Sequence, residues 1–197
     1  MTNPSPDLVA LREAILCGDP GRAMPALVGL REVAVEQAVP LLLLGLEQSM
    51  FMVRSLSCAG LGVKQNEAGW QALVAAMQGD EDANVRAEAA NSLVSHSLER
   101  AWPLLRDVFA VDQQWLVRCS ILSALAEQPA IDPAWLLELA SMAITDADGT
   151  VRVGGAEILA RLVREQGAAE ARVLLQQLQA DPDRGAQWSA ELGWIGH

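Results

Sequence analysis

One short phrase recurs along this chain at a nearly fixed interval. A Val-Arg pair begins at positions 53, 85, 117 and 151, so successive copies lie 32, 32 and 34 residues apart. A leucine follows each valine eight residues later, as Leu61, Leu93, Leu125 and Leu159. A fixed period in this range is typical of proteins built from stacked structural repeats. The repeat therefore limits the possible folds more strongly than any other feature of the sequence.

Each period contains two apolar segments with helical spacing. The second segment begins at the valine, and the residues four and eight positions later share its face, which we expect to be buried. Asp80, Asp112 and Asp146 each precede a valine by five residues. Aspartate favours turns and helix N-caps, so these residues mark the turn between the two helices. Nothing in the sequence alternates with a period of two, as a half-buried strand would.

The pattern predicts an all-α fold, a right-handed α-solenoid of about six helix-turn-helix repeats that forms one domain over residues 1–197. Weaker copies around Arg22 and Ala186 flank the four clear ones, as terminal repeats must face water on one side. The second helices are expected to line the concave side. The expected repeats cover roughly residues 5–31, 33–62, 67–94, 98–126, 132–163 and 167–195.

Charge and composition disfavour several classes of partner. The chain has 25 acidic and 14 basic residues and a net charge of −11, which repels nucleic-acid phosphates and anionic lipid. The longest apolar run, residues 38–46, is too short to cross a bilayer, which takes roughly 20 residues. The first residues lack the pattern of a secretory signal, and three widely separated cysteines suit a reducing compartment. We expect a cytoplasmic protein that binds neither nucleic acid nor membrane.

The phrase around residues 80–93, "DEDANVRAEAANSL", resembles the HEAT repeat. It is similar in particular to the short repeats named after the phycobilisome lyases of cyanobacteria, whose first helix resembles the segments "AVPLLL" and "AWPLLR" of this chain. The resemblance covers roughly residues 5–195. It implies a HEAT-type solenoid, and for the lyase-like group it implies attaching, detaching or chaperoning linear tetrapyrroles on phycobiliproteins. Other members of the wider family are scaffolds, and the resemblance supplies no catalytic residue.

Arg54, Arg86, Arg118 and Arg152 recur in step with the aspartates. We interpret them as a structural ladder in which each arginine bonds the aspartates and carbonyls of turns in its own or a neighbouring repeat. The alternative is a row of arginines that binds carboxylates, such as the propionates of a tetrapyrrole.

The residues that differ between copies are the candidates for recognition. Positions three and six after each valine lie opposite the buried face of the second helix, and most of them are small, so a partner could approach closely. The alternative is a solvated helix face with no partner. Trp115 lies just before its second helix and is not repeated, which leaves a contact role at an interface open beside ordinary packing. The predicted partner-binding groove consists of Phe51, Leu56, Ala59, Glu88, Asn91, Trp115, Cys119, Ser120, Ser123 and Glu157.

Trp70, Trp102 and, to within one residue, Trp135 recur in the first helices. Regular recurrence favours packing between repeats over a ligand-binding aromatic face. Trp188 and Trp194 are expected to help close the C-terminal end.

The sequence contains no catalytic or cofactor motif that we can identify. The cysteines lack the tight spacing of metal or cluster sites, so Cys58 is expected to be a small buried residue. Cys119 is the one candidate, and a weak one, for a ligand to a cluster shared with another protein. His96 and His197 belong to no spaced constellation, and no phosphate loop or metalloprotease motif is present. We expect no bound metal or other cofactor.

The leading hypothesis is a non-catalytic scaffold or adaptor that holds a protein partner along the groove, in phycobiliprotein or phycobilisome handling. The partner would be a phycobiliprotein or another HEAT-repeat subunit. A second hypothesis is a bilin lyase subunit or tetrapyrrole chaperone, which would make the protein part of a phycobilin lyase. A third is an accessory protein that stabilises an iron–sulfur cluster on an assembly partner, with Cys119 and Cys58 as the residues that suggest it.

Overall fold

The computed structural model describes residues 7–178, and all regular structure in this range is helical. The chain falls into two compact units, residues 1–104 and 105–197, and the boundary lies within α7 (Leu98–Val111). The sixth repeat is described only as far as its first helix. The expected positions of Trp188, Trp194 and the second helix of that repeat lie outside the described residues.

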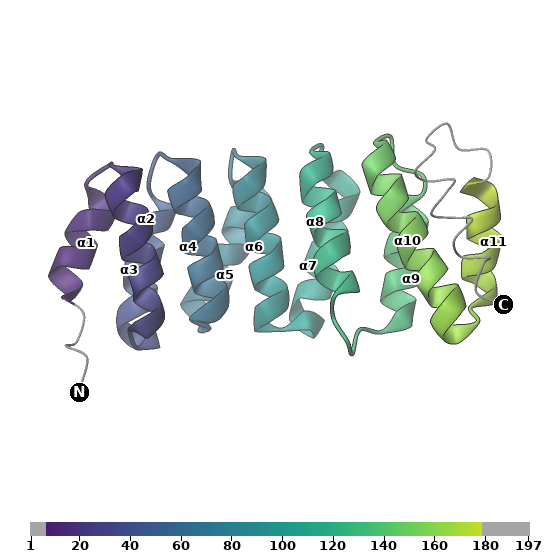
Figure 1. Cartoon of the computed structure of the whole chain (residues 1–197), viewed down its shortest axis with the longest axis horizontal. Helices are drawn as coiled ribbons and strands as arrows, with labels where there is room; N and C mark the ends of the chain where they lie inside the picture. Colours follow the sequence, from purple (N-terminus) through teal and green to yellow (C-terminus); the bar gives the residue numbers. More distant parts are fainter. Residues whose placement is uncertain (1–6, 179–197) are drawn as a thin grey trace. The chain divides into compact units, whose positions relative to one another are not determined.

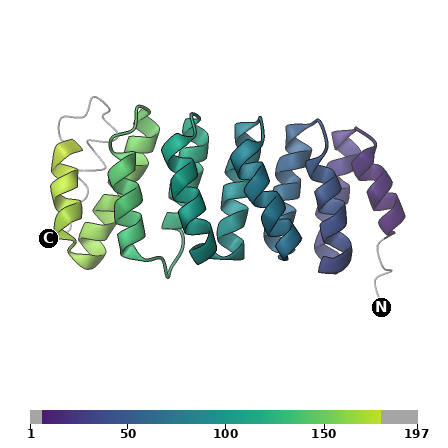
Figure 2. The same ribbon diagram turned by 180° about the vertical axis from the view of Figure 1, so that it is seen from behind.

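The first unit contains three complete helix pairs (Figure 1). Its helices are α1 (Leu8–Leu16), α2 (Pro20–Gly29), the short 3-10 helix η1 (Leu30–Glu32), α3 (Val35–Leu46), α4 (Phe51–Val63), α5 (Glu67–Gly79) and α6 (Ala83–His96). The first helices of the repeats, α1, α3 and α5, pack on one another, and the second helices, α2, α4 and α6, do the same. Each repeat therefore contributes one helix to each of two layers, which can be followed from behind in Figure 2.

The second unit is built in the same way. Its helices after α7 are α8 (Trp115–Ala126), α9 (Pro133–Ala143), α10 (Gly149–Gln166) and α11 (Ala169–Gln177). The second helices α8 and α10 pack on each other, and α10 also contacts the first helices α9 and α11. No helix among the described residues is both long enough and apolar enough to span a membrane.

The core of both units consists of the repeated apolar positions. In α6, Val85, Ala89 and Leu93 are completely buried, as the spacing of four residues along one helical face predicts. The equivalent valines and leucines of α4, α8 and α10 are buried as well. The recurring phrase therefore encodes the surface through which the helices pack.

The aspartates of the turns divide into two roles. Asp82 and Asp148, three residues before their valines, are the N-caps, and their carboxylates accept hydrogen bonds from the amides of Asn84 and Thr150. Asp80 and Asp146, two residues earlier, accept the amides of Asp82 and Asp148 at 2.9 and 2.8 Å. The repeated aspartates thus close the turn that positions the N-cap, and they are not N-caps themselves.

Candidate binding face of the second helices

The repeated arginines point into the turns. In the first unit, Nε and Nη2 of Arg54 donate to the two carboxylate oxygens of Asp80 at 2.8 and 2.9 Å. Nη1 of the same side chain donates to the carbonyls of Gln48 and Ser49 at 3.0 and 2.8 Å. Arg54 therefore joins the turn of its own repeat to the turn of the following one, and its side chain is only 9% exposed.

The same arrangement occurs in the second unit. Arg118 donates through Nε and Nη2 to Asp146 at 2.6 and 2.8 Å, and through Nη1 to the carbonyl of Asp112 at 2.6 Å. Arg86 and Arg152 likewise donate to the carbonyls of Asp80 and Asp146, at 2.9 and 3.0 Å. Since these side chains bind aspartates and carbonyls of the turns, the contacts support the structural interpretation of the arginines.

The ion pairs shift the pKa values of the side chains that form them. Burial alone would raise the pKa of Asp80, but hydrogen bonds from Arg54 and the Asp82 amide outweigh it, and the pKa lies below its ordinary value. The hydrogen bond to Asp80 raises the pKa of Arg54, and that to Asp146 raises the pKa of Arg118. The Arg54–Asp80 pair is therefore ionised at neutral pH.

The variable residues of the first unit lie on the outer face of α4 and α6. Phe51 is exposed, and Leu56, Ala59, Glu88 and Asn91 are half-buried. Glu88 is the less exposed of the two charged candidates. Burial raises its pKa, although a hydrogen bond with Ser92 acts in the opposite direction.

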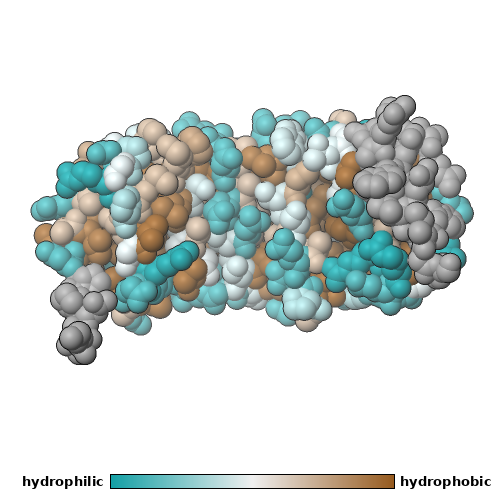
Figure 3. All heavy atoms as spheres, viewed as in Figure 1, coloured by the Kyte–Doolittle hydropathy of each residue, from teal (hydrophilic) through white to brown (hydrophobic). Residues whose placement is uncertain are grey.

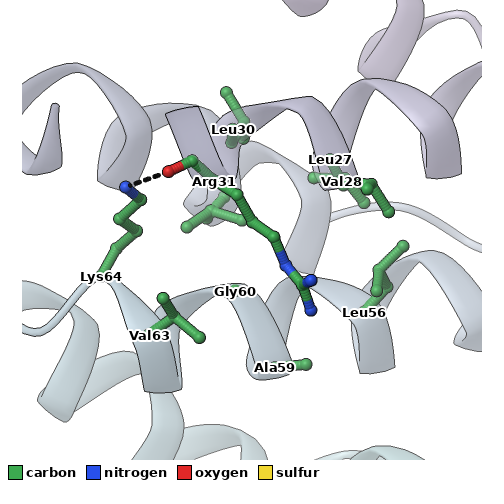
Figure 4. A pocket seen from close by; sticks show the side chains of 10 residues that line it. Leu27, Val28, Leu30, Arg31, Leu56, Ala59, Gly60, Val63 and Lys64 are labelled. Carbon is green, nitrogen blue, oxygen red and sulfur yellow. Dashed lines mark hydrogen bonds between the residues drawn. The ribbon is translucent and has the colours of Figure 1, made fainter. Parts of the chain in front are cut away.

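Leu56 and Ala59 line an open pocket between α2 and α4. Figure 4 shows the pocket from close by, with η1 at one end. Sequence reasoning missed its other lining residues, half of which belong to α2 and η1, where the repeat pattern is weak. The pocket is lined by Leu27, Val28, Leu30, Arg31, Leu42, Leu56, Ala59, Gly60, Val63 and Lys64.

In the second unit the variable residues are more polar. Trp115 is 45% exposed at the start of α8. Cys119 and Ser120 are half-buried, and Ser123 and Glu157 are exposed. Ser123 and Glu157 lie on a second pocket between α8 and α10, which Arg161 and Arg164 also line. In each unit, therefore, two of the predicted groove residues line a pocket between consecutive second helices.

The cysteines are poorly suited to act as thiolates. Burial raises the pKa of Cys58 to about 12. Burial and, less strongly, the charge of Asp148 also raise the pKa of Cys119. Within residues 7–178, no group of three or more His, Cys, Asp or Glu side chains is placed to hold a metal ion.

Trp70 and Trp102 are buried and Trp135 is half-buried, as expected of residues that pack between repeats. The guanidinium carbon of Arg100 lies 4.0 Å from the centre of the Trp70 ring, and its nitrogens donate to Glu67 at 3.1 and 3.2 Å. The sequence placed His96 in no spaced motif. In the structure its ring makes an edge contact with Trp70, and its Nε2 forms a hydrogen bond with the Leu61 carbonyl at 2.9 Å. This cluster ties consecutive repeats together.

Comparisons with known proteins agree with this architecture. Residues 39–126 match the family model of HEAT repeats. No curated protein sequence matches the chain. The crystal structure of YibA from Escherichia coli is similar with a TM-score of 0.69 and 16% identity, over 95% of this chain and 70% of YibA.

Two further solved structures are similar to this chain. A designed armadillo repeat protein is similar with a TM-score of 0.52 and 17% identity, over 95% of this chain and 98% of the design. A chain of the complex of CpcE and CpcF, the phycocyanin lyase of a Nostoc species, is similar with a TM-score of 0.43 and 20% identity, over 95% of this chain and 99% of that chain. At such identities, the structural likeness establishes the fold alone.

The helix pairs, the repeat-family match and the likeness to helical-repeat structures confirm the predicted fold class. Residues 39–126 match the HEAT-repeat family, and the chain has an α-solenoid fold.

Proposed function

We propose that this protein is a non-catalytic scaffold that holds a protein partner on the outer faces of its second helices. The proposal rests on one observation. The repeated arginines bind aspartates and carbonyls of the turns, whereas the variable residues of the second helices remain accessible. Arg54 and Arg118 are bound by Asp80 and Asp146. Trp115, in contrast, exposes almost half of its surface. Exposed aromatic residues are frequent anchors of protein interfaces.

Two properties of these faces suit a protein better than a small molecule. Each unit has an open pocket between consecutive second helices, and the residues beside it are mixed apolar and polar, as in non-obligate interfaces. In the second unit the accessible residues of the second helices include both the aromatic Trp115 and the polar Ser120, Ser123 and Glu157.

The finer proposal is that the partner is a phycobiliprotein or a second HEAT-repeat subunit in a cytoplasmic, phycobilisome-related process. It rests on the resemblance of the repeats to the lyase-like group. Direct binding of a tetrapyrrole is less favoured, because the ladder arginines that would hold its propionates already bind aspartates. A shared iron–sulfur cluster is less favoured too, because the raised pKa values of Cys58 and Cys119 oppose thiolate formation.

The test is affinity purification of the tagged chain from its source organism, followed by mass spectrometry. Trp115→Ala combined with Ser120→Arg is expected to remove the specific partner and to leave helicity unchanged. The matched control is Val173→Ala with Gln176→Arg, an exposed apolar and an exposed polar position on the first helix α11. A partner retained by the first double variant and lost from the second would contradict the proposal, as would the absence of any partner.

A further inference from the structure

Gly60, which lines the pocket between α2 and α4, lies against the side chain of Leu42. A Cβ atom at this position would lie 2.4 Å from Cδ2 of Leu42, which belongs to α3. Leu42 is completely buried and forms part of the pocket lining. The glycine thus lets a first-helix leucine reach the space between two second helices, and the inner surface of the pocket is apolar.

An apolar stripe on α4 leads into the pocket. Met52, Leu56, Ala59 and Val63 are spaced by four, three and four residues, which places them on one face of the helix. Val63 is 62% exposed and Met52 is 39% exposed. Across the pocket, Val28 of α2 is 49% exposed. Figure 3 shows apolar residues gathered over the part of the surface where α2 and α4 lie.

Lys64 fixes one end of the pocket. Its ammonium group donates to the backbone carbonyls of Arg31 and Val33 at 2.8 and 2.7 Å. These bonds hold η1 and the residue that follows it against the C-terminal end of α4. Lys64 therefore positions the backbone of Arg31 and has little capacity left for a ligand.

Arg31 carries the available charge of the pocket. In Figure 4 its side chain extends over the apolar lining, and its guanidinium lies between Val28 and Leu56. Among residues 7–178, the guanidinium has no hydrogen bond or ion pair, unlike that of Arg54. None of the ten lining residues is acidic, although the chain as a whole carries a charge of −11. The pocket is thus an apolar site with a cation at its edge, on a protein of opposite net charge.

We propose that this pocket receives a large apolar side chain of a partner protein and that Arg31 pairs with an aspartate or glutamate next to it in the partner's sequence. This inference rests on the proposed function and specifies the chemistry of the partner. The apolar side chain would cover Leu56, Ala59 and Val63 and so remove them from water. The carboxylate would bind the planar guanidinium through two nitrogens, a geometry that favours arginine over lysine.

The test begins with selection of peptides from a displayed library of random 12-residue sequences on the immobilised full chain. The expected peptides carry an acidic residue next to a large apolar residue. One enriched peptide is then synthesised with its acidic residue intact and with the corresponding amide. Affinities of both forms are measured for the wild type, for Arg31→Gln and, as a matched control on the same helix pair, for Arg22→Gln, which is exposed and does not line the pocket.

Arg31→Gln and the change of the peptide's acid to its amide should each weaken binding about tenfold, as expected when a charged hydrogen-bonded pair is lost. Together they should weaken binding no more than either change alone, because both remove the same interaction. Leu56→Gln should abolish binding, because it places a polar side chain in the pocket. Val63→Gln should have the same effect, and its mostly exposed position means that the fold is not disturbed. Arg22→Gln should have no effect.

Additive effects of Arg31→Gln and the amide peptide would overturn the inference, and so would peptides that lack an acidic residue. If binding survives Leu56→Gln and Val63→Gln but is lost in Trp115→Ala with Ser120→Arg, the inference fails while the proposed scaffold function stands. If no peptide is enriched and octanoate protects Arg31 from modification by phenylglyoxal, the pocket binds a small carboxylate, and the inference is wrong.

Discussion

The guanidinium of Arg54 binds the carboxylate of Asp80, 26 residues further along the chain, through two parallel hydrogen bonds of 2.8 and 2.9 Å. Arg54 belongs to the second helix of one repeat, and Asp80 belongs to the turn of the next. The pair thus fixes the distance between consecutive turns, and Arg118 repeats it with Asp146. The most regular polar residues of the chain serve the stacking of its repeats.

Breaking this pair should destabilise the protein strongly. Asp80→Asn leaves the nearly buried guanidinium of Arg54 with no carboxylate but that of the exposed Glu81, 3.5 Å away, and we expect a loss of about 3 kcal/mol in the free energy of unfolding. Chemical denaturation followed by circular dichroism measures it. Asp107→Asn, in the exposed pair with Arg106, is the control and should change stability little. Equal effects of the two substitutions would contradict the assignment.

The contribution of Asp80 should depend on pH. Its pKa is lower in the folded than in the unfolded protein, so folding favours the ionised carboxylate. The stabilisation is fully present above the unfolded pKa of about 3.9 and is lost as the pH falls through the lower folded value. The difference in stability between wild type and Asp80→Asn should therefore be constant near neutrality and shrink below about pH 4. A difference in stability that grows as the pH falls would contradict the lowered pKa of Asp80.

The close approach of α4 and α6 makes a further prediction. A Cβ atom at Gly62 would lie 2.8 Å from Oγ of Ser92 and 3.1 Å from its Cα. Gly62→Ala must therefore push the two helices apart and should lower stability by about 1–3 kcal/mol. At Gly79 nothing lies within 4 Å of the added atom, so Gly79→Ala should preserve or slightly raise stability. Thermal unfolding of both variants tests this, and a harmless Gly62→Ala would refute the close packing.

The sequence pattern predicted the core well because burial and helical spacing dictate it together. Val85, Ala89 and Leu93 are buried for the same reason that they recur. The pattern did not decide which aspartate each arginine binds, since the partners are 26 and 28 residues apart. It also missed the pocket, because Arg31 lies in the irregular helix η1, where no repeat position marks it. The solvent-exposed helix face could be located by its spacing, but spacing alone did not show that Glu88 on this face is half-buried.

Leu93→Ala tests the core assignment. Leu93 is completely buried, and its truncation should cost roughly 2–5 kcal/mol through lost apolar burial and the cavity that remains. Leu16, which is 39% exposed, provides the same chemical change at the surface, and Leu16→Ala should cost much less. Similar losses of stability in the two variants would contradict the core position of Leu93.

The three cysteines should differ in their reaction with iodoacetamide. Cys17 is exposed, whereas burial raises the pKa of Cys58 to about 12 and also raises that of Cys119. Since the thiolate is the nucleophile, we expect Cys17 to be alkylated first at pH 8 and Cys58 only after unfolding. Mass spectrometry of peptides after timed quenching gives the order, and rapid labelling of Cys58 in the folded protein would contradict its burial.

The central claim, that the second helices hold a protein partner, is tested most directly by site-specific photo-crosslinking in the source organism. A photoreactive amino acid is placed at Asn91, Ser123 or Glu157 on the second helices, and in matched variants at Gln71, Ala75 or Glu138 on the first helices. These control positions are exposed. The account predicts a specific crosslinked protein from the first group and none from the second. Crosslinks from the first-helix positions alone, or from neither group, would contradict it.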